Sequence, residues 1–137
     1  MNDVLLNKKV SMERCIKQIN TYYKLDTGCA FKDDFLKQDA IAFNLQRIAE
    51  LAIDMAAYTI KKYKWGLPKD SRNHFQILET HQVISPELSQ KLQNMVGFRN
   101  VLVHEYQTLD IQLMQDVIEN RLHDLIDYTA NVLESNV

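Results

Sequence analysis

The chain has 137 residues, of which 46% are hydrophobic and 25% are charged, and its formal net charge is −2. This length suits one domain with a hydrophobic core, so we predict a single helical domain over residues 1–137. The charge balance excludes a molecule that is basic throughout, so any nucleic-acid contact must come from a local patch. Three glycines and two prolines are too few for a turn-rich β fold.

No run of apolar residues approaches the roughly 18 that a membrane-spanning helix needs. Met1–Val4 lacks the charged and apolar regions of a signal peptide. Cys15 and Cys29 are the only cysteines, and they form neither a zinc motif nor a disulfide framework. No carboxylate–histidine cluster has the spacing of metal ligands. We therefore expect a cytoplasmic protein with ordinary thiols, no membrane partner, no metal and no cofactor.

Apolar residues recur at three- and four-residue spacings, which predicts helices separated by segments rich in glycine, proline and aspartate. The expected helices cover about Asp3 to Tyr23, Asp33 to Tyr63, Arg72 to His81, Pro86 to Val103 and Asp110 to Glu134. Helices of these lengths with short connections predict an all-α fold. We expect a mostly antiparallel bundle of four main helices plus one short helix.

The fourth helix carries the most unusual stretch of the chain. Ser85 and Pro86 predict its start, since serine favours the N-cap and proline the first turn. From Met95 to Val103 only Arg99 and Asn100 are polar, which predicts a central helix that is buried all round. Gly97 in its middle would allow another helix to approach closely.

An arginine in such a helix needs a carboxylate, a cleft open to water or an anionic ligand, because an unpaired charge is costly to desolvate. Glu50 and Asp54 share a face of the second helix with Gln46, so either acid is a candidate partner for Arg99. The same two acids could equally form a ladder on the helix surface.

Arg99, His104 and Tyr106 meet where the apolar run ends. Arginine can fork onto phosphate oxygens, and histidine can move a proton near neutral pH. Arg99 and His104 are five positions apart, about 140° round a straight helix, so they would not point at one atom. Either the helix ends near Val103 and the backbone turns His104 back, or the two side chains meet across a dimer interface. Asn100 shares a face with His104.

The segment Gly97–Tyr106 resembles the Arg-x4-His-x-Tyr motif of the HEPN superfamily, and its flanking residues resemble the HepT-type toxins. Val83–Leu88, Asn44–Leu45 and Glu50–Asp54 are also similar to that family. The resemblance implies a small all-helical endoribonuclease, the toxin of a toxin–antitoxin pair. It also implies an antitoxin partner, a minimal nucleotidyltransferase that attaches AMP to Tyr106.

Cleavage of RNA by its 2′-hydroxyl requires a base for that hydroxyl and an acid for the leaving oxygen. One chain offers one histidine at this site, whereas a two-fold homodimer would offer two. Arg99 would stabilise charge on the phosphate, His104 would be the general acid or base, and Asn100 would bind the phosphate or orient His104. No step requires a metal ion. The apolar residues expected around the two-fold axis are Val96, Val101 and Val103.

Two charged segments lie outside the motif. Lys61, Lys62, Lys64 and Trp65 form the one basic stretch, where lysines could bind RNA phosphates while bases stack on the indole. Alternatively, these cations only stabilise the C-terminal end of a helix, where the helix dipole is negative. The last helix carries six acids and one base on its outer face, which is either solvated or a docking surface for a basic partner.

Two other functions stay open at this stage. The chain could be a non-catalytic nucleotide-binding or scaffold subunit of a nucleotidyltransferase complex, which would bind nucleotides without cleaving RNA. It could also be a plain helical interaction module, in which Arg99 merely pairs with an acid inside the core.

Overall fold

The computed structural model describes residues 2–137, apart from the side chain of residue 108. The described residues form helices and connecting segments and contain no strand, which confirms the all-α class. The main helices are α1 (Asp3–Lys24), α2 (Phe35–Tyr63), α3 (Ser71–Thr80), α4 (Pro86–His104), α5 (Ile111–Asp116) and α6 (Leu122–Ser135). Short helical turns complete the list: η1 (Phe31–Asp33), η2 (Tyr106–Thr108) and the π-helical η3 (Val117–Arg121).

Side-chain caps explain why the helices begin where they do. Ser85 Oγ accepts a hydrogen bond from the Leu88 amide at 3.1 Å, and Pro86 occupies the first turn, as the sequence predicts. The other capping oxygens belong to Asn2 for α1, Asp34 for α2, Asp70 for α3 and Asp110 for α5. Because a cap is a local feature, the start of α4 was readable from the sequence alone.

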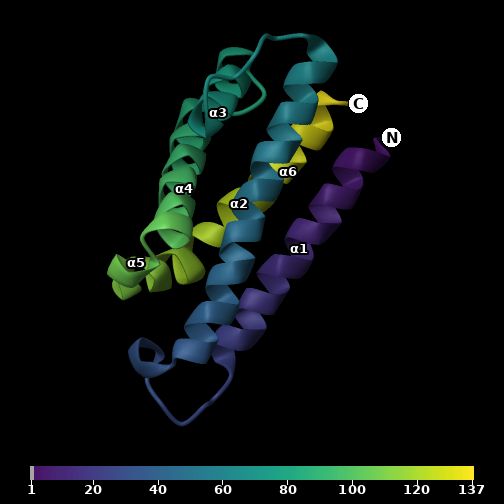
Figure 1. Ribbon diagram of the computed structural model, residues 1–137. Helices are drawn as coiled ribbons and strands as arrows, with labels where there is room; N and C mark the ends of the chain where they lie inside the picture. Colours follow the sequence, from purple (N-terminus) through teal and green to yellow (C-terminus); the bar gives the residue numbers. More distant parts are fainter. Residues whose placement is uncertain (1) are drawn as a thin grey trace.

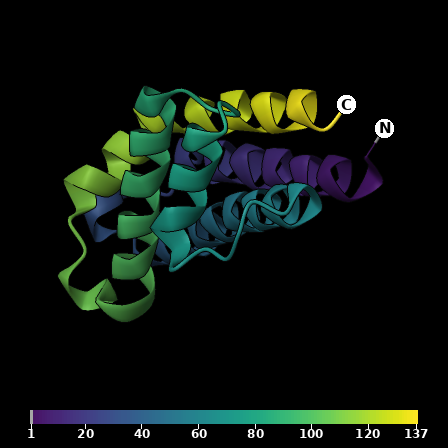
Figure 2. The same cartoon turned by 90° about the horizontal axis from the view of Figure 1, so that it is seen from above.

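The helices form two groups that cross (Figures 1 and 2). Helices α1 and α2 run antiparallel side by side, with α6 beside them, and the α3–α4 pair lies across this group. Figure 1 places the α2–α3 connection at the top of the molecule, the α1–α2 connection at the bottom, and α5 in the lower part, below α4. None of the described helices is long and apolar enough to cross a membrane.

Tyr128 of α6 contacts both groups of helices in the core. Its side chain is fully buried, its hydroxyl donates to the Ala52 carbonyl of α2 at 2.7 Å, and its ring packs edge-on against Phe75 of α3 at 5.7 Å between centroids. The apolar residues that recur at three- and four-residue spacings along α2 are all buried: Ile41, Leu45, Ile48, Ala52, Met55, Ala56 and Ile60.

Helix α4 is not buried all round, so that expectation was wrong. Val103 is 39% exposed and Val101 is half-buried, whereas Val96 lies inside the core of its own chain and cannot line a dimer interface. The nearest group to a Cβ built on Gly97 is the Arg72 guanidinium, at 2.6 Å from Nη2. Gly97 therefore admits a side chain from α3, not the backbone of another helix.

The single last helix expected from Asp110 to Glu134 is interrupted. The π-helical turn η3 separates α5 from α6, and the Asp116 carboxylate bonds Arg121 across this wider turn, at 2.8 Å to Nη2. Asp124 is buried and pairs with Lys91 of α4 at 3.5 Å. One of the six acids assigned to the outer face thus points inward, because the wide turn changes which residues share a face.

Candidate functional site

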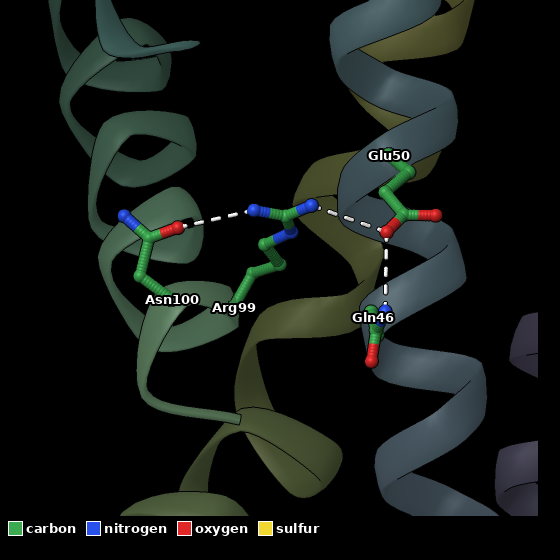
Figure 3. A network of polar contacts seen from close by, with 4 residues as sticks. All are labelled: Gln46, Glu50, Arg99 and Asn100. Atoms are coloured by element: carbon green, nitrogen blue, oxygen red, sulfur yellow. Dashed lines mark hydrogen bonds and ion pairs between the residues drawn. The ribbon is translucent and has the colours of Figure 1, made fainter. Parts of the chain in front are cut away.

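Arg99 joins the C-terminal half of α4 to the middle of α2 (Figure 3). Its Nη2 lies 3.2 Å from Glu50 Oε1, and the same oxygen accepts a bond from Gln46 Nε2 at 3.2 Å. Glu50 is therefore the partner that the sequence argument required. Asp54 instead pairs with Lys8 of α1 at 3.7 Å, which removes it from the site.

The guanidinium keeps hydrogen-bonding capacity beyond this pair. Nη1 donates to Asn100 Oδ1 at 3.2 Å, and the buried Nε has no partner among residues 2–137. The side chains of Arg99 and Glu50 are 26% and 43% exposed, so solvent screens their attraction. Such a pair contributes on the order of 1 kcal/mol or less, which a bound anion can offset.

His104 is the last residue of α4 and is exposed. The Glu105 amide donates to the Val101 carbonyl at 2.9 Å, so the helix continues through His104 and the backbone does not turn it back. Within residues 2–137 the imidazole has no hydrogen bond or ion pair. Arg99 faces α2 while His104 faces solvent, and Asn100, bonded to Arg99, lies one turn before His104.

Tyr106 follows in η2, half-buried, and its hydroxyl donates to Asp39 Oδ1 of α2 at 2.7 Å. Burial, this hydrogen bond and the negative charge of Asp39 all raise the pKa of Tyr106 well above its ordinary value. The phenol is therefore neutral at physiological pH. Tyr106 and His104 line one open depression at the end of α4, together with Val103, Glu105 and Gln107.

The predicted basic stretch lies far from this site within one chain. Lys61, Lys62 and Lys64 are exposed at the C-terminal end of α2, at the top of Figure 1, whereas the end of α4 and α5 lie in the lower part of the molecule. The Trp65 ring already stacks on His81 at 4.0 Å and on Tyr63 at 5.0 Å between centroids. A base could stack on this indole only by competing with these rings.

A groove between α1 and α2 presents cations that the sequence argument missed. Arg14 and Arg47 line it with Phe43, and its nine lining residues include no acid. Neither arginine has an ion pair in the part of the chain that the structure describes. The Arg47 guanidinium lies 5.9 Å from the Phe43 ring centroid, and Phe43 is 61% exposed. This combination of cations and an exposed ring suits phosphates and bases.

Three residues of α6 that could act as metal ligands lie close together, although the sequence spacing predicted no metal site. Ligand atoms of His123, Asp124 and Asp127 lie within 4.8 Å of one another. The Asp124 carboxylate already pairs with Lys91 at 3.5 Å and with His123 at 3.3 Å. These contacts account for the cluster, which includes no residue of the motif.

Comparisons with known proteins agree on one family. The family model described as "Ribonuclease HepT-like" matches residues 12–132. The mRNA nuclease HepT of Shewanella oneidensis is 40% identical over 124 residues, covering 90% of this chain and 92% of that protein. The tRNA nuclease HepT of Aphanizomenon flos-aquae is 36% identical over 66 residues, covering 48% of this chain and 45% of that protein.

Solved structures with the same fold include a toxin similar in sequence to this chain. The tri-AMPylated Shewanella oneidensis HEPN toxin in complex with MNT antitoxin has a TM-score of 0.90 and 37% identity, covering 98% of this chain and 99% of that chain. YutE of Bacillus subtilis, a cytosolic protein of unknown function, has a TM-score of 0.75 at 15% identity, covering 94% and 87%. That likeness extends to the fold alone.

Proposed function

This chain belongs to the HepT-like ribonuclease family, and on that premise we propose that it is the toxin of a toxin–antitoxin pair, a cytoplasmic endoribonuclease. One observation carries the proposal: the same helix carries an incompletely bonded Arg99 guanidinium and, five positions later, an exposed, unbonded His104. A plain interaction module would pair Arg99 with an acid inside the core. The Arg99–Glu50 pair is half-exposed instead, which favours a ligand site.

The proposed reaction uses only groups of the chain and of the RNA. The 2′-oxygen attacks the adjacent phosphorus, the bond to the 5′-oxygen breaks, and one proton leaves the 2′-hydroxyl while another reaches the 5′-oxygen. Arg99 stabilises the charge that grows on the phosphate oxygens. His104 transfers one of the protons, and Asn100 holds Arg99 toward the phosphate through its amide oxygen. No metal ion takes part in these steps.

A two-fold homodimer would complete this site. A single exposed His104 cannot be acid and base at once, and Arg99 and His104 leave α4 on different sides. The half-buried Val101 and the exposed Val103 precede the histidine on α4 and would be covered by a second copy. Across a two-fold axis, the arginine of one protomer and the histidine of its partner can face the same phosphate.

The groove lined by Arg14, Phe43 and Arg47 is the best candidate for the path of the RNA. Phe43 lies one turn beyond Asp39 on α2, and Asp39 contacts Tyr106, so the groove borders the motif. Lys61, Lys62, Lys64 and Trp65 lie at the other end of α2, and we propose that they contact only an RNA long enough to span the molecule.

Tyr106 is the proposed point of control. The related toxin in the solved complex is tri-AMPylated, and its partner there is MNT antitoxin. We propose that a minimal nucleotidyltransferase attaches AMP to the Tyr106 hydroxyl of this chain. Because Tyr106 and His104 line one depression, the added anion would occupy the position of the substrate phosphate.

We expect Arg99→Ala and His104→Ala each to lower the rate of RNA cleavage at least about 100-fold, because each removes a group that acts in the transition state. Circular dichroism and thermal melting should stay close to the parent, since neither side chain fills the core. His123→Ala removes an exposed histidine outside the motif and is the matched control. A folded His104→Ala protein that cleaves at the parental rate contradicts the mechanism. Nucleotide binding by a parent that cleaves no RNA would support the scaffold alternative.

Sedimentation should show a species of about twice the mass of one chain. Val103→Asp places a charge in the proposed interface and should give a monomer that has lost most of its cleavage activity. Val10→Asp, at a 57% exposed position on α1, is the control and should remain dimeric and active. A strictly monomeric parent that cleaves RNA is incompatible with a shared site.

RNA affinity is best measured in the His104→Ala background, where the ligand stays intact. Combined Arg14→Ala and Arg47→Ala should weaken binding about tenfold, and the slope of log K against log salt should fall by about 1.4, that is ~0.7 per lost contact. Lys17→Ala, on α1 but outside this groove, should change neither quantity as much. Unaltered affinity and slope in the double variant would exclude the groove as the RNA path.

Co-expression with the cognate minimal nucleotidyltransferase should add one or more AMP units to the chain, mapped to Tyr106 by intact-mass measurement and peptide analysis. Tyr106→Phe should acquire none, keep at least part of its nuclease activity and escape neutralisation. Tyr63→Phe, which alters an exposed tyrosine at the far end of α2, should behave as the parent does. If Tyr106→Phe is neutralised as well as the parent, the antitoxin acts by covering the site.

A further inference from the structure

The hydrogen bond between Tyr106 and Asp39 has no role in the cleavage step. The two residues are 67 positions apart, and the phenolic hydroxyl points at a carboxylate oxygen 2.7 Å away. Asp39 is exposed on α2, and no other hydrogen bond or ion pair of its side chain exists within residues 2–137. Its carboxylate thus has one structural partner, the hydroxyl proposed to accept AMP.

Attachment of AMP to a phenol releases the phenolic proton, which needs an acceptor. Tyr106 Oη forms a bond to the α-phosphorus of ATP, the bond from that phosphorus to the bridging oxygen of pyrophosphate breaks, and pyrophosphate leaves. The oxygen must lose its proton as the new bond forms, because a neutral phenol is a weak nucleophile. Burial and the neighbouring carboxylate keep the pKa of Tyr106 high, so ionisation ahead of the reaction is disfavoured.

We infer that Asp39 is the general base for this transfer and accepts the phenolic proton from Tyr106 as the oxygen–phosphorus bond forms. The inference rests on the proposed modification of Tyr106. Its geometry is that of a base already within hydrogen-bond reach of the proton it removes. Because Asp39 is exposed, the proton then passes to water. The toxin chain therefore supplies a catalytic group for its own inactivation, and the transferase supplies the nucleotide.

A second consequence concerns the order of additions. A tyrosine hydroxyl can take only one phosphodiester bond, so any further AMP unit on the same side chain must be attached to the first one. Only the first addition removes the phenolic proton. Loss of Asp39 should therefore slow the first addition and leave later additions, measured from the singly modified chain, at the parental rate.

The test compares the full-length parent, Asp39→Ala and Asp39→Asn with purified transferase and ATP, following AMP addition by intact mass. Both variants should acquire the first AMP at least about 100-fold more slowly, in line with the loss of a general base. RNA cleavage by the unmodified variants should match the parent. Asp33→Asn removes an exposed acid six positions earlier on η1, and it should be modified at the parental rate.

Formate separates a base from a residue that only positions the phenol. Asp39→Ala leaves room for a small carboxylate, so formate should restore part of its modification rate, whereas Asp39→Asn fills that space and should not respond. Parental modification of Asp39→Ala would overturn the inference, and so would a slow variant that formate does not rescue. Loss of RNA cleavage in Asp39→Ala would instead make Asp39 part of the nuclease site. A parent that cleaves RNA but acquires no AMP would refute the modification, and with it this inference, while leaving the nuclease proposal intact.

Discussion

The positive charge of Arg99 has to be compensated where α4 packs on α2. Glu50 provides the compensation from α2, with Gln46 holding the same carboxylate oxygen. The pair is half-exposed, so it costs little desolvation and contributes little net stability. A fully buried pair would hold the guanidinium too firmly for a phosphate to displace the acid. The partial exposure of this contact is thus what makes a structural ion pair compatible with a binding role.

Helix α2 also sets the spacing of the other polar contacts. Asp39 and Glu50 are eleven positions apart, which is about three turns and roughly 16 Å along the helix axis. Asp39 holds Tyr106 and Glu50 holds Arg99, so one straight helix fixes both ends of the motif. Phe43 and Arg47 lie on the turns between them and reach toward α1. A change in the rotation of α2 would therefore move the Tyr106 contact, the Arg99 contact and the groove together.

The sequence predicted the parts of this arrangement that depend on local rules. The start of α4 followed from Ser85 and Pro86. The need of Arg99 for a partner followed from the cost of an unpaired charge, with Glu50 as one of two candidate acids. Two features could not be predicted: the contact between Asp39 and Tyr106, and the presence of Arg14 and Arg47 in the lining of one groove. Both depend on the rotation and register of helices far apart in sequence, which residue spacing within one helix does not determine.

The failed expectations have the same origin. Val96 was assigned to an outer face because the helix pattern around it is apolar on every side, and only the packing of the chain shows which valines the core takes. The interruption of the last helix is a second case. The wide turn at η3 rotates every later side chain about the helix axis, so Asp124 is buried although the sequence pattern places it on the outer, acidic face.

The proposed modification site and the proposed nuclease site lie in one depression of the surface. Tyr106 and His104 lie two positions apart on the wall of one depression, and this closeness follows from the chain leaving α4 directly into η2. A phosphate attached at Tyr106 would bring a negative charge to the depression that holds His104. Across the proposed two-fold axis, the Arg99 guanidinium of the second protomer, weakly held by its own Glu50, would then be able to bind either an RNA phosphate or the attached AMP. On this argument, inactivation needs no conformational change, because the inhibitor is tethered where the substrate binds.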